Sequence, residues 1–301
     1  MAMNWGVFRT RALTALVFVI VMSAGLLTSH WLFLLLFTVI HFGCWYEFQR
    51  LMGIIYPEYA GISPFHKYGV QLAGWGGILL ATANVWSVGT LSLSSIGFWI
   101  LLLCLLVFPV ADFLFTRQSG FRTIRLSLIG LIYISVSISL IVHIRSGAIW
   151  LSSSADDLAG LLSSVSAKIG GFFIPLLMIA SIWINDTMAY IVGSFIGKTP
   201  LSAVSPKKTW EGTIGGIVLS TAIVTASGYF YGASWWDFLA ISLLAAIAGT
   251  FGDLFESKLK RMAGVKDSGH FMPGHGGFLD RFDSLLFAIP FVWLYTFFFT
   301  R

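Results

Sequence analysis

Three aspartates bracket one polar segment near the C-terminus. Asp253 opens the segment, and Asp280 and Asp283 close it, three residues apart at the start of the last apolar stretch. Residues at this spacing share one face of a helix, so both carboxylates can point the same way. Carboxylates at this density, with no soft ligands nearby, suit Mg²⁺ better than Zn²⁺. We therefore predict that Asp253, Asp280 and Asp283 are catalytic and bind a metal ion.

The same segment carries groups that bind phosphate. Its four candidate cations, enough to neutralise several phosphates, are Lys258, Lys260, Arg261 and Lys266, and Lys266 is also counted as catalytic. Gly274, Gly276 and Gly277 expose backbone N–H groups. Carboxylates, cations and exposed N–H groups are together the components of phosphoryl or nucleotidyl transfer. His275, between two glycines, is a candidate for a catalytic or phosphate-contacting role and equally for a role in structuring the loop. The alternative is that Asp280 or Asp283 caps a helix while the cations contact lipid headgroups.

A second polar segment, residues 198–211, repeats this combination upstream. The hydroxyls and cations that we expect to bind substrate are Ser205, Lys207, Lys208 and Thr209. A basic anchor at the membrane surface has the same composition, so that reading stays open. Asp186 interrupts the apolar stretch before this loop. Because a charge at membrane depth is costly, we expect Asp186 either to pair with a buried lysine or to contact metal or substrate.

Two glycine patterns near this segment favour structure over chemistry. Residues 193–199, GSFIGKT, resemble a phosphate-binding P-loop but are one residue short, and no strand precedes them. Gly212 and Gly216 form a GxxxG pair, which is typical of close helix packing. No pattern of a zinc peptidase or a serine hydrolase occurs.

The elements that position these residues are membrane-spanning helices. Of 301 residues, 57% are hydrophobic and 10% are charged, against about 25% charged in soluble domains. This composition excludes a soluble enzyme, a disordered chain, a coiled coil and an ordinary nucleic-acid-binding domain. Cys44 and Cys104 lie inside apolar runs and are expected to be packing thiols.

Uncharged stretches predict an all-α bundle of nine spans, because a crossing helix needs about 20 apolar residues. The predicted spans lie near residues 12–28, 31–47, 69–88, 96–115, 125–144, 171–195, 213–231, 237–254 and 283–300. The count becomes eight or ten if the 171–197 region is broken or re-entrant. A signal peptide is the competing interpretation of residues 1–28, although no cleavage site stands out.

Charge sets the orientation. With the N-terminus placed in the cytoplasm, 15 of the 18 Lys and Arg residues fall on the cytoplasmic side, as the positive-inside rule requires. We expect one membrane domain over residues 1–301, with N-terminal spans in 1–170 and catalytic spans in 171–301. Both polar loops, 198–211 and 253–283, then face the cytoplasm. The Ser-rich stretch 146–168 is predicted to be a solvated extracytoplasmic loop.

The C-terminal motifs resemble those of the phosphatidate cytidylyltransferases, also called CDP-diacylglycerol synthases. The resemblance rests on Ser257–Arg261, Lys266–Gly269, Pro273–Gly277 and Asp280–Asp283, with Ser205–Gly212 upstream. Over the N-terminal half the similarity extends only to hydropathy and span count. The resemblance implies a polytopic enzyme of the bacterial inner membrane that condenses CTP with phosphatidic acid, giving CDP-diacylglycerol and pyrophosphate.

The resemblance also assigns roles to individual residues. It implies a requirement for Mg²⁺, with K⁺ able to share the site, and places the metal-binding aspartates at Asp253 and Asp280, with Asp283 close by. The basic residues of the segment would hold phosphates. Asp267 and Arg281, which lie inside the motifs, are counted with the substrate-binding residues.

Other functions compete with this one. A related CTP-dependent enzyme could act on an archaeal ether lipid or a polyprenol, and a secondary transporter would also use broken, charged spans. A transporter usually shows internal repeats, and none is found between the halves. The acidic motif of the CDP-alcohol phosphotransferases is absent. No nucleic-acid partner is expected, and the glycine-rich helix faces permit a homodimer without requiring one.

Overall fold

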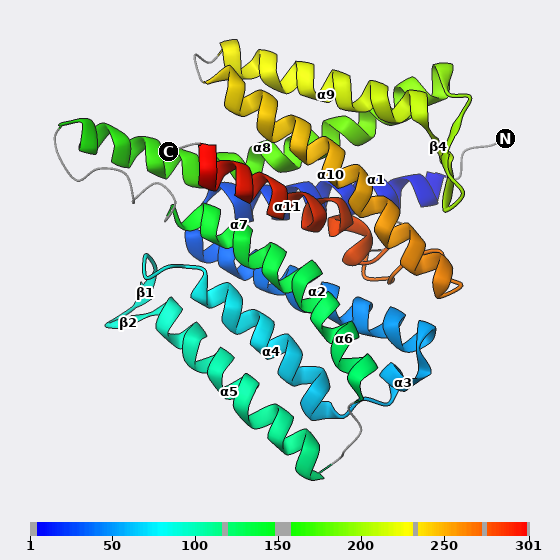
Figure 1. Cartoon of the computed structure of the whole chain (residues 1–301). Coiled ribbons are helices and arrows are strands. Elements are labelled where there is room, and N and C mark those ends of the chain that lie inside the picture. The colour runs from blue at the N-terminus through cyan, green and yellow to red at the C-terminus, as the bar shows by residue number, and fades with distance from the viewer. Residues whose placement is uncertain (1–4, 116–119, 148–157, 231–233, 273–275, 300–301) are drawn as a thin grey trace. The chain divides into compact units, whose positions relative to one another are not determined.

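The chain folds into α-helices joined by short loops and two small hairpins. The computed structural model describes residues 5–115, 120–147, 158–230, 234–272 and 276–299 (Figure 1). Within these residues the α-helices are α1 (Trp5–Leu27), α2 (His30–Ile55), α3 (Pro57–Ala60), α4 (Pro64–Leu80), α5 (Leu93–Phe115), α6 (Phe121–Gly130), α7 (Ser137–Ser146), α8 (Leu158–Ile196), α9 (Trp210–Phe230), α10 (Trp235–Met262) and α11 (Leu279–Phe299). A π-helical turn, η1 (Leu131–Val136), joins α6 to α7. The prediction of an all-α fold is confirmed.

Seven helical stretches are long and apolar enough to cross a membrane, counted over the described residues. They are His30–Ile55, Leu93–Phe115, Phe121–Ser146, Phe172–Ile196, Trp210–Phe230, Trp235–Met262 and Leu279–Phe299. The two other predicted spans fall in α1, whose apolar part is Ala12–Leu27, and in α4, which has 17 residues. The chain is therefore a helical membrane protein, while the count of nine stays a prediction.

The breaks between the predicted spans have local causes. Ser29 caps α2, because its hydroxyl accepts a hydrogen bond from the Leu32 amide at 3.2 Å. Between α4 and α5 the antiparallel strands β1 (Ser87–Val88) and β2 (Leu91–Ser92) form a hairpin. Gly89 turns this hairpin with a φ of +61°, a conformation that glycine adopts without strain. The predicted spans leave gaps at residues 29–30 and 89–95, and the helices are interrupted at both places. The predicted span 69–88 is too long at its end, because α4 ends at Leu80.

Residues 148–157 of the predicted loop 146–168 lie outside the described residues, and the prediction is wrong from Leu158 onward. Helix α8 begins at Leu158 and continues for 39 residues, through Pro175, to Ile196. The serines concealed a helical pattern, since Leu158, Leu161, Leu162 and Val165 follow the spacing of one helix face. The 171–195 span is the C-terminal part of this single uninterrupted helix.

The chain divides into two compact units. The first contains residues 1–142 and 259–282, and the second contains residues 143–258 and 283–301. Helix α10 passes from the second unit to the first at Lys258, and α11 returns to the second unit at Asp283. Each unit is described below by itself, and the prediction of a single membrane domain stays a prediction.

In the first unit α4 and α5 lie side by side (Figure 1). Glycines allow this approach, because a Cβ on Gly76 would come within 3.0 Å of the Gly97 carbonyl oxygen. Around α2 the buried core includes Trp45 and Phe48, whose rings pack against Gly130 of α6. Bringing α2 into this core fixes the position of its one buried acid, Glu47.

In the second unit α8 and α9 are linked by a hairpin of strands β3 (Pro200–Ser202) and β4 (Ser205–Thr209) and pack closely. A Cβ on Gly212 would come within 2.7 Å of the Ala189 carbonyl oxygen, and one on Gly216 within 2.8 Å of the Asn185 carbonyl oxygen. The predicted packing role of the GxxxG pair is confirmed. The P-loop reading is excluded, since residues 193–196 end helix α8 rather than follow a strand.

Gly216→Val should destabilise the second unit. The valine side chain would enter the backbone of α8, and overpacking of this kind costs about 1–3 kcal/mol. Thermal unfolding of the detergent-solubilised chain, followed by tryptophan fluorescence, measures the loss. Ala222→Val adds a similar side chain at an exposed position of the same helix and should leave the transition unchanged. Equal transitions for the two variants would contradict the packing interpretation.

Candidate functional site

Asp280 lies in the first turn of α11 and is held by three donors. Its Oδ1 accepts from Lys260 Nζ at 2.7 Å, and its Oδ2 accepts from the backbone N–H groups of Ser268 at 2.9 Å and Gly277 at 2.7 Å. Only 5% of the Asp280 side chain is exposed. A carboxylate fixed by an ammonium group and two N–H groups is oriented before any substrate arrives, which is what electrostatic catalysis requires.

A second carboxylate, from the N-terminal half of the chain, shares a hydrogen-bond partner with Asp280. Glu47 of α2 is 3% exposed. Its Oε1 accepts from the Phe278 amide at 2.9 Å, and its Oε2 accepts from the Leu279 amide at 2.8 Å and from Ser268 Oγ at 2.7 Å. Glu47 thus binds the amides at the N-terminus of α11, where the helix dipole favours a negative charge.

Ser268 joins the two carboxylates. Its hydroxyl donates to Glu47, its own amide donates to Asp280, and the Asp280 amide donates back to Ser268 Oγ at 3.2 Å. We call Glu47, Lys260, Ser268 and Asp280 the Glu47–Asp280 cluster. All four residues belong to the first unit.

Glycines make room for this cluster. A Cβ on Gly269 or on Gly277 would overlap the Glu47 carboxylate. Gly276 has a φ of +85° and pairs with Met272, whose amide donates to the Gly276 carbonyl oxygen at 2.9 Å. The glycines of the motif therefore allow the close approach of a backbone to a carboxylate. The Gly277 amide, predicted from sequence to face phosphate, donates to Asp280.

Sequence reasoning missed Glu47 as a functional residue. A signal was present, because an acid inside an apolar helix is a functional candidate by default. Counting uncharged residues ended the predicted span at residue 47, whereas α2 continues to Ile55. Glu47 is therefore interior to the helix and not at its edge.

In the second unit Asp253 of α10 forms an ion pair with Lys208 of β4. The side chains are 26% and 35% exposed, so water and solutes reach the pair. The predicted substrate-binding loop and the first predicted metal ligand are thus in contact.

Asp283 is buried beside the same part of α10. Its Oδ1 accepts from the Ser284 amide at 2.6 Å. A Cβ on Gly252 would come within 3.0 Å of the Ser284 Cα, so α10 and α11 approach closely next to Asp253. The hydrogen bonds of these two carboxylates differ from the capping role weighed for them. Asp280 accepts from the Ser268 and Gly277 amides, which precede α11, and Asp283 accepts from the adjacent Ser284 amide. The amides at the start of α11 donate to Glu47.

The loop between α8 and α9 is closed by Glu211. Its carboxylate accepts from the Lys198 amide at 3.1 Å and from Thr199 Oγ1 at 2.8 Å. Thr209 Oγ1 accepts from the Gly212 amide at 3.2 Å, which caps α9. Thr209 therefore has a structural role, and Glu211, which was not predicted as a site residue, holds the loop that presents Lys208.

The remaining predicted residues lie around these contacts. Those whose side chains are exposed are Asp186, Lys207, Lys258, Arg261, Lys266 and Arg281. Ser205, Asp267 and Gly276 are half-buried. His275 lies outside the described residues.

The predicted metal ligands Asp253, Asp280 and Asp283 offer carboxylate oxygens, which suit a hard cation. Asp253 and Asp280 each bind a lysine ammonium group, so both attract positive charge. Within the described part of the chain, no three or more His, Cys, Asp or Glu side chains gather as one metal-binding group. The metal ligands predicted at Asp253, Asp280 and Asp283 stay a prediction.

Comparison with known proteins gives phosphatidate cytidylyltransferases among the relatives of this chain. Over 127 residues the chain is 42% identical to a phosphatidate cytidylyltransferase of Synechocystis, covering 42% of this chain and 43% of the relative. It is 46% identical over 112 residues to one of Staphylococcus aureus, covering 36% and 43%, and 37% identical over 171 residues to one of Staphylococcus haemolyticus, covering 54% and 66%. The matches thus span less than two thirds of the length of these relatives.

A family match covers nearly the whole chain. The model of the cytidylyltransferase family matches residues 9–299, which includes both polar loops, the Glu47–Asp280 cluster and the Lys208–Asp253 pair. The motifs that suggested nucleotidyl transfer, the all-α membrane fold and this match agree, and the chain belongs to the cytidylyltransferase family.

Proposed function

We propose that this chain is a phosphatidate cytidylyltransferase, which transfers the cytidylyl group of CTP to phosphatidic acid and releases pyrophosphate. The observation that carries the proposal is the oriented carboxylate of Asp280, fixed by Lys260 and two amides inside the family motif. The curated relatives bear the same name. Both substrates are phosphates, and their approach needs a site that combines cations with fixed carboxylates.

In the proposed reaction a phosphatidate oxygen attacks the α-phosphorus of CTP in line. A new P–O bond forms, the bond between the α-phosphorus and the bridging oxygen breaks, and pyrophosphate leaves with the electron pair. Lys208, Lys258, Arg261 and Lys266 would hold the phosphates. A phosphatidate oxygen is already anionic, so the proposal needs no general base; His275 and Asp267 would contact substrate.

Asp253, Asp280 and Asp283 would hold Mg²⁺, with K⁺ able to share the site. The ion would neutralise the charge that develops on the transferring phosphate. Lys260 keeps the buried Asp280 oriented, whereas Lys208 pairs with Asp253 at a position that solvent reaches.

The proposed location is the inner membrane of a bacterium, with the site facing the cytoplasm. The named relatives are bacterial, and the distribution of Lys and Arg supports a cytoplasmic position for both polar loops. CTP would reach such a site from water, and phosphatidate would reach it sideways from the leaflet.

A panel of acceptor lipids tests the substrate. The purified chain is given CTP labelled in the α-phosphate, Mg²⁺ and, separately, phosphatidate, an ether-linked analogue and a polyprenyl phosphate. We expect label in the lipid phase with phosphatidate and its loss on addition of EDTA. Transfer to another lipid alone would keep the chemistry and change the substrate, and no transfer to any acceptor by folded protein would contradict the proposal.

Lys208→Gln should weaken CTP binding more than turnover. The variant removes one phosphate-binding cation and releases the Asp253 carboxylate, and we expect the KM for CTP to rise about tenfold, equivalent to about 1.4 kcal/mol. Arg122→Gln breaks a surface pair with Glu58, whose side chains are 52% and 60% exposed, and should change KM by less than about twofold. Equal KM values for the two variants would show that Lys208 does not bind CTP.

A further inference from the structure

The first unit contains a cavity that the proposed reaction does not use. It has a volume of about 670 Å³ and lies between α4, α5 and α6, reaching the first residue of η1. Its walls are mostly apolar, and the polar side chains in the lining are His66, Asp112 and Ser127. Volumes of this size are typical of small-molecule sites.

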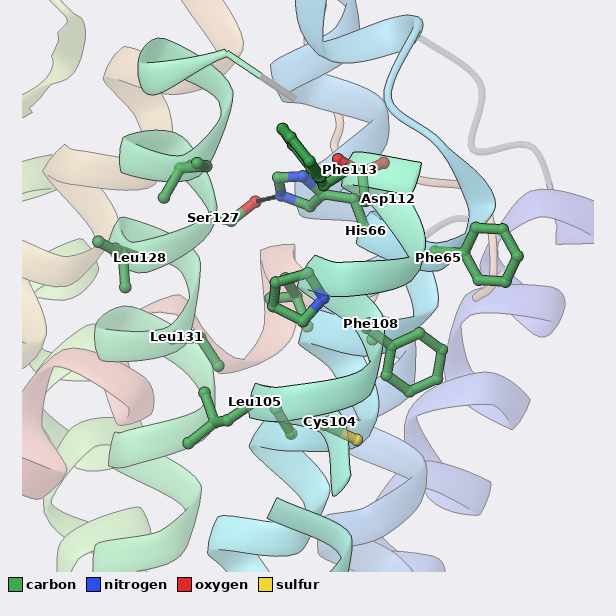
Figure 2. A pocket seen from close by; sticks show the side chains of 15 residues that line it. Phe65, His66, Cys104, Leu105, Phe108, Asp112, Phe113, Ser127, Leu128 and Leu131 are labelled. Carbon is green, nitrogen blue, oxygen red and sulfur yellow. Dashed lines mark hydrogen bonds between the residues drawn. The ribbon is translucent and has the colours of Figure 1, made fainter. Parts of the chain in front are cut away.

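The polar residues gather at one end. In Figure 2 Asp112, His66 and Ser127 lie together, while Leu105, Cys104 and Leu131 lie at the opposite end. His66 Nε2 and Ser127 Oγ are 2.8 Å apart, and Tyr59 Oη is 3.0 Å from the same Ser127 Oγ. Ser63, which also caps α4, donates to Asp112. The polar end is therefore a built network with an acid in it.

The length of α5 that lines the cavity is comparable to the thickness of one membrane leaflet. Eight residues of α5 separate Asp112 from Cys104, which corresponds to about 12 Å of helix. Half of the hydrocarbon core of a bilayer is about 15 Å. Asp112 lies three residues before Phe115, where the candidate membrane span of α5 ends, so the polar end lies near the end of that span.

Some of the apolar side chains that line the cavity are also exposed on the surface of the first unit. Leu105 and Phe113 of α5 and Leu128 of α6 line the cavity and remain 60%, 65% and 51% exposed. Leu131, the first residue of the π-helical turn, also lines it. Single π-helical turns in α-helices are frequently found at functional sites.

We propose that this cavity binds one membrane lipid whose headgroup carries a primary ammonium, with an acyl chain along the apolar wall and the ammonium at Asp112. The gradient from polar to apolar in the cavity matches that of a lipid. The described lining has a carboxylate and neither Lys nor Arg, so it favours a hydrogen-bond-donating cation over a phosphate monoester. A carboxylate accepts several donors, so Asp112 can bind an ammonium while it retains Ser63. This ligand differs from the anionic acceptor proposed above.

Native mass spectrometry of the full-length, delipidated chain tests the proposal with three lipids of equal chain length. Phosphatidylethanolamine has a primary ammonium, phosphatidylcholine has a quaternary one that cannot donate, and phosphatidylglycerol has none. We expect phosphatidylethanolamine to bind about tenfold more tightly than phosphatidylcholine, as one charge-assisted hydrogen bond allows. Asp112→Asn should remove this preference. Equal binding of the ethanolamine and choline lipids to the unmodified chain would overturn the proposal.

A matched pair of variants tests the place of binding. Leu105→Trp fills the cavity from an exposed position, whereas Leu106→Trp adds the same ring at a neighbouring residue that is 59% exposed and outside the lining. Leu105→Trp should weaken lipid binding about tenfold or more, because two or more buried CH₂ groups are lost, and Leu106→Trp should not. A change in dimer formation in place of lipid binding would identify a second copy of the chain as the occupant and refute the lipid site.

Discussion

Glu47→Ala should lower cytidylyl transfer about a hundredfold or more, a loss comparable to that of one oriented group at a transition state. The variant leaves the Phe278 and Leu279 amides and the Ser268 hydroxyl without their acceptor. The start of α11, which carries Asp280, then loses its anchor on α2. Initial rates at saturating CTP and phosphatidate measure the effect.

The distinguishing result is which kinetic constant changes. Among the described residues, the hydrogen bonds of Glu47 go to the segment that carries Asp280. We therefore expect kcat to fall while the KM for CTP stays within about threefold, a loss confined to the transition state. Glu47→Gln keeps one acceptor oxygen and should retain an intermediate kcat. Glu58→Ala, an exposed acid in the same unit, is the control and should behave as the unmodified chain. If Glu47→Ala raised the KM for CTP and lowered the stability while kcat stayed the same, Glu47 would have a purely structural role.

Asp280→Asn should lower kcat by about 10²–10³, the range seen when one group that stabilises developing charge is removed. The carboxylate accepts from Lys260, Ser268 and Gly277, and an asparagine can accept on one side only. Its amide nitrogen must face a donor, so we also expect a loss of stability of about 1–3 kcal/mol. Rates and thermal unfolding measured on one preparation give both effects.

A double variant separates a catalytic role of Asp280 from a structural one. In Asp280→Asn the amide nitrogen can face Lys260 while the oxygen keeps the Ser268 and Gly277 amides. Adding Lys260→Met removes the opposing donor, so stability should return while turnover stays low. Recovery of turnover together with stability would show that Asp280 has only a structural role.

The sequence predicted the membrane helices and the chemistry of the polar loops, because both depend on local composition. The uncharged stretches gave a break at Ser29 and another near Gly89, where the structure has a hairpin, and the motif identified Asp280 and its glycines. The start of α8 was missed because serines interrupt its apolar face. Local patterns therefore decide elements and motifs, with errors at their boundaries.

Contacts between distant residues could not be predicted in the same way. The bonds of Glu47 to Phe278 and Leu279 join residues more than two hundred positions apart, and nothing in one sequence pairs them. Lys208 and Asp253 were both predicted as site residues, yet their ion pair depends on how β4 meets α10. The polar end of the α4–α6 cavity likewise draws His66, Asp112 and Ser127 from three helices.

The most direct measurement follows two labels through one reaction. CTP labelled in the α-phosphate and CTP labelled in the γ-phosphate are incubated in parallel with the purified chain, phosphatidate and Mg²⁺. The account predicts that the α-label enters the lipid phase, that the γ-label appears only in pyrophosphate, and that the two products form in equal amounts. Entry of the γ-label into lipid would mean phosphoryl transfer by a kinase-type reaction, and no transfer of either label by folded protein would contradict the enzymatic account.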